Sequence, residues 1–363
     1  MNDDSPTLFS ILPCSSPLAT IWNHNAALRP DLRYGPRFML DTALRLLACP
    51  RCRGGLTLGP EAVRAPDGHI ATGELACARC AVRFPIVRGI PRLVPDRVMD
   101  GAVETAARFG AEWKIFDHMS NYQEQWFKNW LAPIGPADFA GKVVFEGGCG
   151  KGRHTVVAAS WGVKDIVALD LGDAVEVAFA HTRHLPNVHV VQGDLMTPPV
   201  GRVFDLAFSI GVLHHLPAPR AGFDALRGLV VPHGKLAIWV YGYESNEWIV
   251  RWVNPVRERV TSKLPIGLLY RLSLPPSALL AAAAKLWASR LGDRLPYRDY
   301  LRALAPLPLR EIHSIVFDQL VTPIAYYLPR AEVTSWFDVD GVSDVTIGWH
   351  NQNSWRGAAT VTA

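Results

Sequence analysis

A glycine-rich segment in the middle of the chain has the residue types needed to hold a small organic cation. Residues 142–152 read Lys-Val-Val-Phe-Glu-Gly-Gly-Cys-Gly-Lys-Gly, so an acidic residue ends an apolar run and alternate glycines follow it. A dinucleotide-binding loop would need a glycine at Arg153, and a carboxylate beside it would repel a pyrophosphate. The carboxylate instead favours an ammonium or sulfonium group. The pattern therefore indicates S-adenosylmethionine, bound by Glu146, Gly148, Gly150 and Gly152.

Two aspartates end the next apolar runs along the chain. Asp170 closes Ile-Val-Ala-Leu-Asp, 18 residues after Gly152, and Asp194 closes Val-Val-Gln-Gly-Asp. The carboxyl ends of parallel strands meet at one edge of a sheet, where ligands of α/β proteins bind. There Asp170 can accept hydrogen bonds from both ribose hydroxyls, and Asp194 can accept one from the amine of adenine. Each aspartate alone could be a loop cap, but together with the glycine loop they predict a nucleoside-binding edge.

Four further residues could act as general bases at the same edge of the sheet. His214 and His215 follow the apolar run 204–209, and Tyr241 and Tyr243 follow the run 235–240. Methyl transfer needs an aligned nucleophile and removal of its proton, so these four are the candidate catalytic residues. Two alternatives stay open. The histidines could have a structural role beside the cofactor, and the tyrosines could only wall the pocket.

The cysteines predict a metal site. Cys49-Pro-Arg-Cys52 and Cys77-Ala-Arg-Cys80 form two Cys-x-x-Cys pairs separated by 24 residues. Two such pairs can present four thiolates tetrahedrally to one Zn²⁺, which leaves no open position for a reacting water. A redox pair would instead stand alone at the head of a helix after a strand. We therefore expect structural zinc, held by Cys49, Cys52, Cys77 and Cys80.

The order of apolar runs indicates an α/β fold. Strand-like runs at 142–146, 165–170, 188–191, 204–209 and 235–240 alternate with helical stretches, and the runs at 343–348 and 356–361 predict a closing hairpin. Aromatic residues at helical spacing over 101–131 predict an amphipathic helix or an aromatic lid. The predicted regions are an irregular arm at 1–43, a zinc ribbon at 44–97, an aromatic helical connector or lid at 98–140, and an α/β domain at 141–363 with a helical cap insertion at about 245–325.

Two segments resemble known families. The runs VVFEGGCGKG, IVALD, VVQGDL and FDLAFSIGVLHHLP are similar to class I S-adenosylmethionine-dependent methyltransferases over about 100 residues, with His233 where that family usually has glycine. The resemblance implies a Rossmann-like sheet of seven strands, and it adds Leu171, Leu195 and Ile210 to the cofactor-binding residues. The cysteine segment resembles, over about 50 residues, the zinc-ribbon family of the small activator subunit of eukaryotic tRNA and release-factor methyltransferases and its bacterial relatives.

Composition guides the choice of acceptor. Lys and Arg number 37 against 33 Asp and Glu, a net charge of +4 that falls short of a nucleic-acid-binding footprint. The insertion is apolar and aromatic, so we expect it to cap a small-molecule acceptor such as a natural-product intermediate, an amino-acid derivative or a sugar, and we expect nucleic acid not to be a partner. Two alternatives stay open. One is an rRNA or tRNA base methyltransferase, since the order of zinc cysteines and methyltransferase domain also resembles bacterial rRNA guanine methyltransferases. The other is a non-catalytic cofactor-binding scaffold whose ribbon recruits a partner.

The sequence also predicts the compartment. It begins Met-Asn-Asp-Asp without a basic, apolar leader, and its cysteines form a metal-binding pattern rather than a disulfide framework. No run reaches the roughly 18 uninterrupted apolar residues of a membrane span. We expect a cytoplasmic enzyme without a membrane span, and the sequence leaves a homodimer open.

Overall fold

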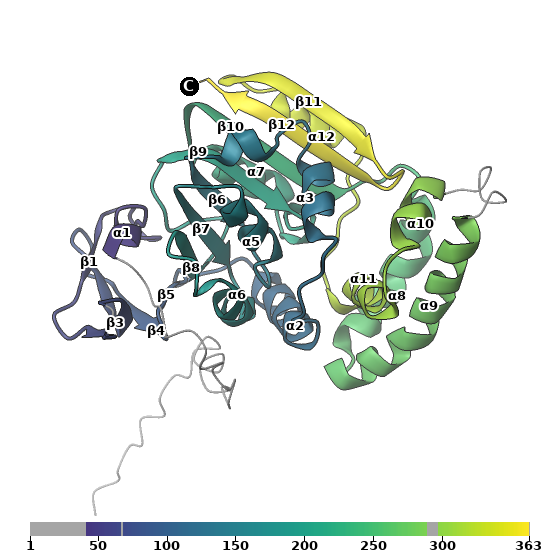
Figure 1. The fold of residues 1–363 in the computed structure, drawn as a ribbon, viewed down its shortest axis with the longest axis horizontal. Helices are drawn as coiled ribbons and strands as arrows, with labels where there is room; N and C mark the ends of the chain where they lie inside the picture. Colours follow the sequence, from purple (N-terminus) through teal and green to yellow (C-terminus); the bar gives the residue numbers. More distant parts are fainter. Residues whose placement is uncertain (1–40, 67, 289–296, 363) are drawn as a thin grey trace, which may run out of the picture. The chain divides into compact units, whose positions relative to one another are not determined.

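The computed structural model describes residues 41–66, 68–288 and 297–362. The predicted arm at 1–43 lies almost entirely outside these residues. The described chain is built on one mixed sheet with the strand order β1-β3-β4-β5-β8-β7-β6-β9-β10-β12-β11, and β2 pairs with β3 (Figure 1). The predicted α/β fold is thereby confirmed.

The five predicted central strands are present and parallel. Their apolar runs are nearly continuous because helices cover both faces of the sheet. The antiparallel hairpin at the carboxyl end of the chain is also present and longer than predicted. The bounds are β6 (Val143–Gly147), β7 (Asp165–Asp170), β8 (Val188–Gly193), β9 (Phe204–Ile210), β10 (Val230–Tyr241), β11 (Val342–His350) and β12 (Ser354–Val361).

Two layers of helices bury the sheet (Figure 1). Phe127, Phe139 and Val157 pack with Phe208 on one face, which α3 (Gln123–Leu131), α4 (Pro136–Phe139) and α5 (Arg153–Ser160) cover. On the other face, α7 (Pro219–Arg227) and α12 (Arg330–Phe337) contribute to a core with the inward side chains of the sheet. A further helix, α6 (Ala174–Thr182), packs against α2, α5, β7 and β8.

The zinc-ribbon region continues the main sheet. A short helix, α1 (Asp41–Leu44), precedes the antiparallel strands β1 (Leu56–Leu58), β2 (Val63–Arg64), β3 (Ile70–Cys77) and β4 (Arg83–Val87). The next strand, β5 (Ile90–Leu93), pairs with β4 on one side and in parallel with β8 on the other. Buried ribbon residues such as Ile70 and Leu75 belong to the same apolar core as Phe145 and Val191. The ribbon and the main sheet therefore share both backbone pairing and core.

The aromatic segment after the ribbon forms two helices rather than one. The first, α2 (Ala102–Ile115), ends at Phe116, and α3 begins at Gln123. Between them, the buried ammonium group of Lys151 donates hydrogen bonds to the carbonyls of Phe116 and His118, both at 2.8 Å. A buried cation needs such acceptors, and carbonyls become available where a helix ends. The break between α2 and α3 thus provides hydrogen-bond acceptors for the Lys151 ammonium group. The aromatic spacing did not predict this need.

The predicted cap is a helical insertion between β10 and α12. Its outer helix, α9, packs against α10 and α11. Buried side chains of the cap form two small cores, one of which includes Phe116 of the aromatic segment. The elements are η3 (Ile249–Val253), α8 (Asn254–Arg259), η4 (Thr261–Lys263), α9 (Ile266–Trp287), α10 (Arg298–Leu304) and α11 (Leu309–Val321).

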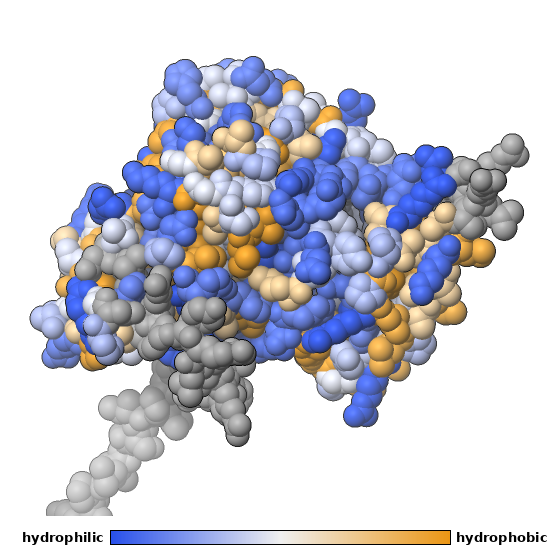
Figure 2. All heavy atoms as spheres, in the orientation of Figure 1, coloured by the Kyte–Doolittle hydropathy of each residue, from blue (hydrophilic) through white to orange (hydrophobic). Residues whose placement is uncertain are grey.

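The outer face of α9 is apolar. Hydrophobic side chains gather on the surface over this helix (Figure 2), where Leu272 is 54% exposed and Leu279 is 72% exposed. The segment Ile266–Leu286 is long and apolar enough to cross a membrane by length and composition, and 17% of its most apolar window is buried. Its inner face, which carries Leu269, Ser273 and Ala284, is buried in the cap.

Candidate cofactor and acceptor site

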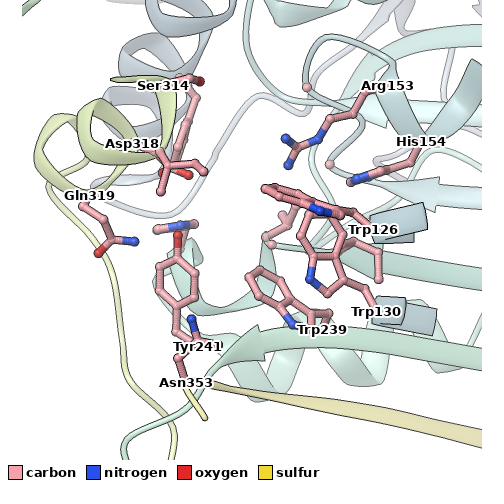
Figure 3. A pocket seen from close by; sticks show the side chains of 18 of the residues that line it. Trp126, Trp130, Arg153, His154, Trp239, Tyr241, Ser314, Asp318, Gln319 and Asn353 are labelled. Atoms are coloured by element: carbon pink, nitrogen blue, oxygen red, sulfur yellow. The ribbon is translucent and has the colours of Figure 1, made fainter. Parts of the chain in front are cut away.

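A cavity of about 590 Å³ lies at the carboxyl edge of the parallel strands. This volume is within the usual range for sites that bind small molecules and cofactors. The strand ends and the glycine loop, the aromatic residues of α2 and α3, and the cap helices α10 and α11 line it. Residues from the start of the insertion, from α9 and from the turn of the closing hairpin also contribute. Figure 3 shows cap residues from α11 on one side of the cavity and Arg153 and His154 on the other.

The glycine loop forms a turn between β6 and α5. Gly148, Gly150 and Gly152 all have positive φ angles, of 79°, 52° and 81°, a region that favours glycine. A Cβ atom at Gly148 would lie 2.3 Å from a Val212 methyl group, and one at Gly150 would lie 2.9 Å from the Trp113 indole nitrogen. Gly148 and Gly150 line the cavity, whereas Gly152 packs on Ala178 behind the loop. The loop is therefore a close-packed cradle, in which larger residues would clash with side chains that also line the cavity.

Glu146 lies beneath the loop and does not line the cavity. Its side chain is buried and accepts a hydrogen bond of 2.5 Å from the Thr155 hydroxyl, and His154 Nδ1 is 3.6 Å from its other oxygen. Burial raises the pKa of Glu146 to about 8. That other oxygen, Oε1, is buried without a hydrogen-bond partner among the described residues. Direct contact between Glu146 and a cofactor stays a prediction.

Asp170 and Asp194 line the cavity as predicted. The two oxygens of Asp170 accept hydrogen bonds from the amides of Gly150 and Gly172, both at 2.9 Å, and Asp194 accepts one from the Met196 amide at 2.8 Å. Burial raises the pKa of both carboxyl groups, and these backbone amides oppose the shift. Each carboxylate keeps lone pairs free for a ligand. Leu171, Leu195 and Ile210 line the cavity beside them.

These features fit S-adenosylmethionine. The glycine cradle leaves room for backbone to approach a ligand, and the two carboxylates offer acceptors for ribose hydroxyls and an adenine amine. The buried carboxylates of Asp170 and Asp194 would also stabilise the positive charge of this ligand.

The four candidate bases differ in their positions. His215 and Tyr241 line the cavity. His214 is buried behind them and receives a 3.4 Å hydrogen bond from the Tyr241 amide, while Tyr243 is 39% exposed and lies outside the cavity lining. Burial lowers the pKa of His215 to about 3 and that of His214 well below its usual value, and burial raises the pKa of Tyr241. Both histidines are therefore neutral and weakly basic, and their catalytic role stays a prediction.

Several residues that line the cavity from the cap were missed by the sequence analysis. Ser314 and Asp318 are one helical turn apart on α11, and Tyr300 on α10 and Tyr327 after α11 also line the cavity. Asp318 Oδ1 is buried without a hydrogen-bond partner among the described residues, and the Tyr241 hydroxyl donates a hydrogen bond to this carboxylate. The sequence carries no distinctive signal for this pair, because α11 also carries the polar residues Arg310, Glu311, His313 and Gln319. Two other aromatic residues of the insertion lie elsewhere, because Trp252 is 65% exposed and Tyr270 packs against Phe116.

The four predicted metal ligands converge. The Sγ atoms of Cys49, Cys52, Cys77 and Cys80 all lie within 4.8 Å of one another, and none of these cysteines forms a disulfide. A Cβ atom at Gly54 would lie 3.1 Å from the Cys77 sulfur, so the backbone approaches the thiols closely. Four thiols at this spacing fit a tetrahedral structural Zn²⁺.

The comparisons with known proteins agree with both sites. Residues 145–238 match the family described as Methyltransferase domain, and residues 42–89 match the family described as Trm112p-like protein. The chain therefore carries a class I S-adenosylmethionine-dependent methyltransferase domain preceded by a Trm112p-like zinc ribbon, as the sequence resemblance implied. Among solved structures, the chain resembles the DhpI–SAH complex, with a TM-score of 0.46 and 15% identity over 73% of this chain and 99% of that chain.

The curated relatives are tRNA-modifying enzymes. The chain is 27% identical to a tRNA U34 carboxymethyltransferase of Aeromonas hydrophila over 202 residues, which cover 52% of this chain and 58% of that protein. It is 29% identical to a tRNA U34 carboxymethyltransferase of Methylococcus capsulatus over 170 residues, which cover 43% and 52%. The chain thus spans little more than half the length of these relatives.

Two sequence predictions are wrong in this light. The relatives contradict a small-molecule acceptor of the natural-product, amino-acid or sugar type, and they contradict the expectation that nucleic acid is not a partner. The physical reason is that net charge averages over the whole surface. A base held in an aromatic cavity is bound by stacking and local hydrogen bonds, which the average does not report.

Proposed function

We propose that this protein is a cytoplasmic enzyme that transfers a methyl group from S-adenosylmethionine to a base of tRNA. The observation that carries the proposal is the naming of the relatives reported above as tRNA U34 carboxymethyltransferases. The geometry supports it, since one cavity joins the cofactor-binding edge to an aromatic wall.

The cofactor side of the cavity belongs to the sheet. Gly148 and Gly150 let the backbone approach the ligand, Asp170 accepts the ribose hydroxyls, and Asp194 accepts the adenine amine. Leu171 and Ile210 cover the apolar parts of the ligand. The bound cofactor supplies an electrophilic methyl group on a sulfonium, so the protein has to align the acceptor, exclude water and accept a proton.

The acceptor side has walls suited to a flipped-out base. The rings of Trp126 and Trp130 lie 5.5 Å apart, and those of Trp130 and Trp239 lie 5.0 Å apart (Figure 3). The guanidinium of Arg153 lies 5.6 Å from the Trp130 ring. Enzymes that act on bases take them out of the helical stack and hold them between aromatic side chains. Indole rings and a guanidinium plane are the groups that provide such stacking.

The test is transfer of a labelled methyl group to tRNA. Purified protein, S-adenosylmethionine labelled in the methyl group, and bulk tRNA from cells that lack this protein should give labelled tRNA. An Asp170→Ala variant, whose cofactor binding is impaired, should give much less. Ribosomal RNA serves as the specificity control. No label in tRNA under conditions where the protein binds S-adenosylhomocysteine would contradict the proposal.

A further inference from the structure

The cap contributes an acidic group to the cavity that faces the cofactor-binding edge. Asp318 lies near the carboxyl end of α11, the last helix of the insertion, and Figure 3 shows it across the cavity from Arg153. The neighbouring hydroxyl of Tyr241 donates a hydrogen bond to it. Oδ1 of Asp318 is buried and has no hydrogen-bond partner among the described residues. A buried carboxylate oxygen without a partner is costly, so it indicates a missing hydrogen-bond donor.

The other candidate proton acceptors around the cavity are less suitable. His215 Nδ1 donates a hydrogen bond of 2.6 Å to the Ile324 carbonyl, so Nδ1 is the protonated nitrogen. Burial keeps the ring neutral and weakly basic. Glu112 is fully buried behind Ser314 and does not line the cavity. The Tyr241 phenol has a raised pKa and is already a donor to Asp318. Among these groups, Asp318 lines the cavity and has a carboxylate oxygen, Oδ1, that lacks a hydrogen-bond partner among the described residues.

We propose that Asp318 accepts the hydrogen bond, and then the proton, of the O–H or N–H group of the base that is alkylated. This inference rests on the proposed function, and it names the acceptor as a base with a polar hydrogen at the reacting atom. The acceptor atom forms a bond to the methyl carbon, and the electron pair of the carbon–sulfur bond stays on sulfur. The proton released from the acceptor atom passes to the Asp318 carboxylate.

The surroundings of Asp318 set the pH at which it can act. Burial raises its pKa to about 6, and the Tyr241 hydrogen bond and two arginines oppose that shift. The carboxylate is thus ionised at neutral pH and becomes protonated as the pH falls through about 6, so turnover should fall there. The titratable or charged groups that act on it come from several elements: Glu112 on α2, Arg153 on α5, Tyr241 on β10, Arg257 on α8, Tyr300 on α10 and Tyr327 after α11.

The experiment compares Asp318→Asn with Asp299→Asn, the same substitution at an exposed carboxylate of α10 that does not line the cavity. Asp318→Asn should lower kcat for tRNA by about 100-fold or more, the usual contribution of a general base. Calorimetry should find its affinity for S-adenosylhomocysteine within about twofold of wild type, since the proposed cofactor contacts are those of Asp170, Asp194 and the glycine loop. Asp299→Asn should stay close to wild type in both measurements. An Asp318→Asn variant that is folded and as active as wild type overturns the inference.

A second variant keeps the test decisive if Asp318→Asn does not fold. Tyr241→Phe removes the hydrogen bond that lowers the pKa of Asp318, so the acid limb of the pH–rate profile should move to higher pH. An acid limb that stays at its wild-type position overturns the inference. Failure of the proposed function looks different, because wild-type protein would then transfer no methyl group to tRNA at any pH.

Discussion

The zinc ribbon and the helical cap are both additions to the same sheet, but they are attached to it in different ways. The ribbon enters the sheet through β5, which pairs with β8, and its apolar residues join the main core. The cap has small cores of its own, and it meets the sheet mainly around the cavity. The difference indicates that the ribbon is part of what stabilises the fold, whereas the cap is part of what selects and activates the acceptor.

Loss of the predicted zinc from the ribbon should lower the free energy of unfolding most. Cys77→Ser removes one of four thiols, and a structural zinc site contributes folding free energy directly. Because the ribbon shares a core with the sheet, the free energy of unfolding of the whole described unit should fall by on the order of 5 kcal/mol. Metal analysis and denaturant unfolding would measure it. A variant that loses zinc yet unfolds at the wild-type midpoint would show that the ribbon is an independent module.

The buried ion pair at the junction should have the next largest effect. Arg92 on β5 donates hydrogen bonds to Glu176 on α6 and to Gln192 on β8, and it is 5% exposed. Arg92→Met leaves a buried carboxylate with one arginine fewer, which should cost about 3 kcal/mol of unfolding free energy. Arg83→Ala is the matched control, since its partner Glu74 lies 3.0 Å away on the exposed surface, where a pair contributes about 0–1 kcal/mol. Equal losses in the two variants would argue against the junction as a stabilising contact.

The cofactor-binding edge of the sheet lies between the zinc ribbon and the cap. Its affinity for the cofactor should depend on neither of them. S-adenosylhomocysteine should bind wild type in the low micromolar range, about −8 kcal/mol. Asp170→Ala should weaken binding by about 2 kcal/mol, because it removes a charged acceptor for the ribose hydroxyls and a partner of the Gly150 amide. Calorimetry checks both values. Unchanged affinity in this variant would mean that the cofactor does not bind at the strand ends.

Replacing one tryptophan by alanine should have the smallest effect. It should also distinguish most clearly a residue inside the cavity from one outside it. Trp126 lines the cavity, and Trp252 is an exposed tryptophan of the cap outside it. Trp126→Ala should lower kcat/KM for tRNA by a factor that corresponds to about 1–2 kcal/mol, the value of one base–aromatic stack. Trp252→Ala should leave it within about twofold, since this residue is exposed and is not part of the cavity lining. Steady-state methylation measures both, and the reverse ranking would place the acceptor outside this cavity.

The sequence predicted the parts of the site that local patterns encode. The glycine loop, Asp170 and Asp194 could be found because a strand end and a turn are neighbours along the chain. The cysteine ligands could be found because two short pairs carry the whole coordination set. Asp318 could not be found in this way, since its place opposite the strand ends depends on how α9, α10 and α11 pack.

Two features of the fold were hidden for the same reason. The pairing of Arg92 with Gln192 joins residues 100 apart in the sequence, and no local pattern specifies it. The break between α2 and α3 depends on Lys151, whose buried ammonium needs two backbone carbonyls. The aromatic spacing of this segment predicted helix correctly but not its interruption.

Our main proposal is that this protein transfers a methyl group to a tRNA base that binds in the cavity. Mass spectrometry of nucleosides from tRNA treated with wild-type protein and S-adenosylmethionine tests it most directly. We expect one nucleoside to gain the mass of a methyl group, with loss of that product in Asp170→Ala and Asp318→Asn. A product with the mass of a carboxymethyl group would contradict the choice of transferred group. An unchanged nucleoside profile, obtained with protein that binds S-adenosylhomocysteine, would contradict methyl transfer to tRNA.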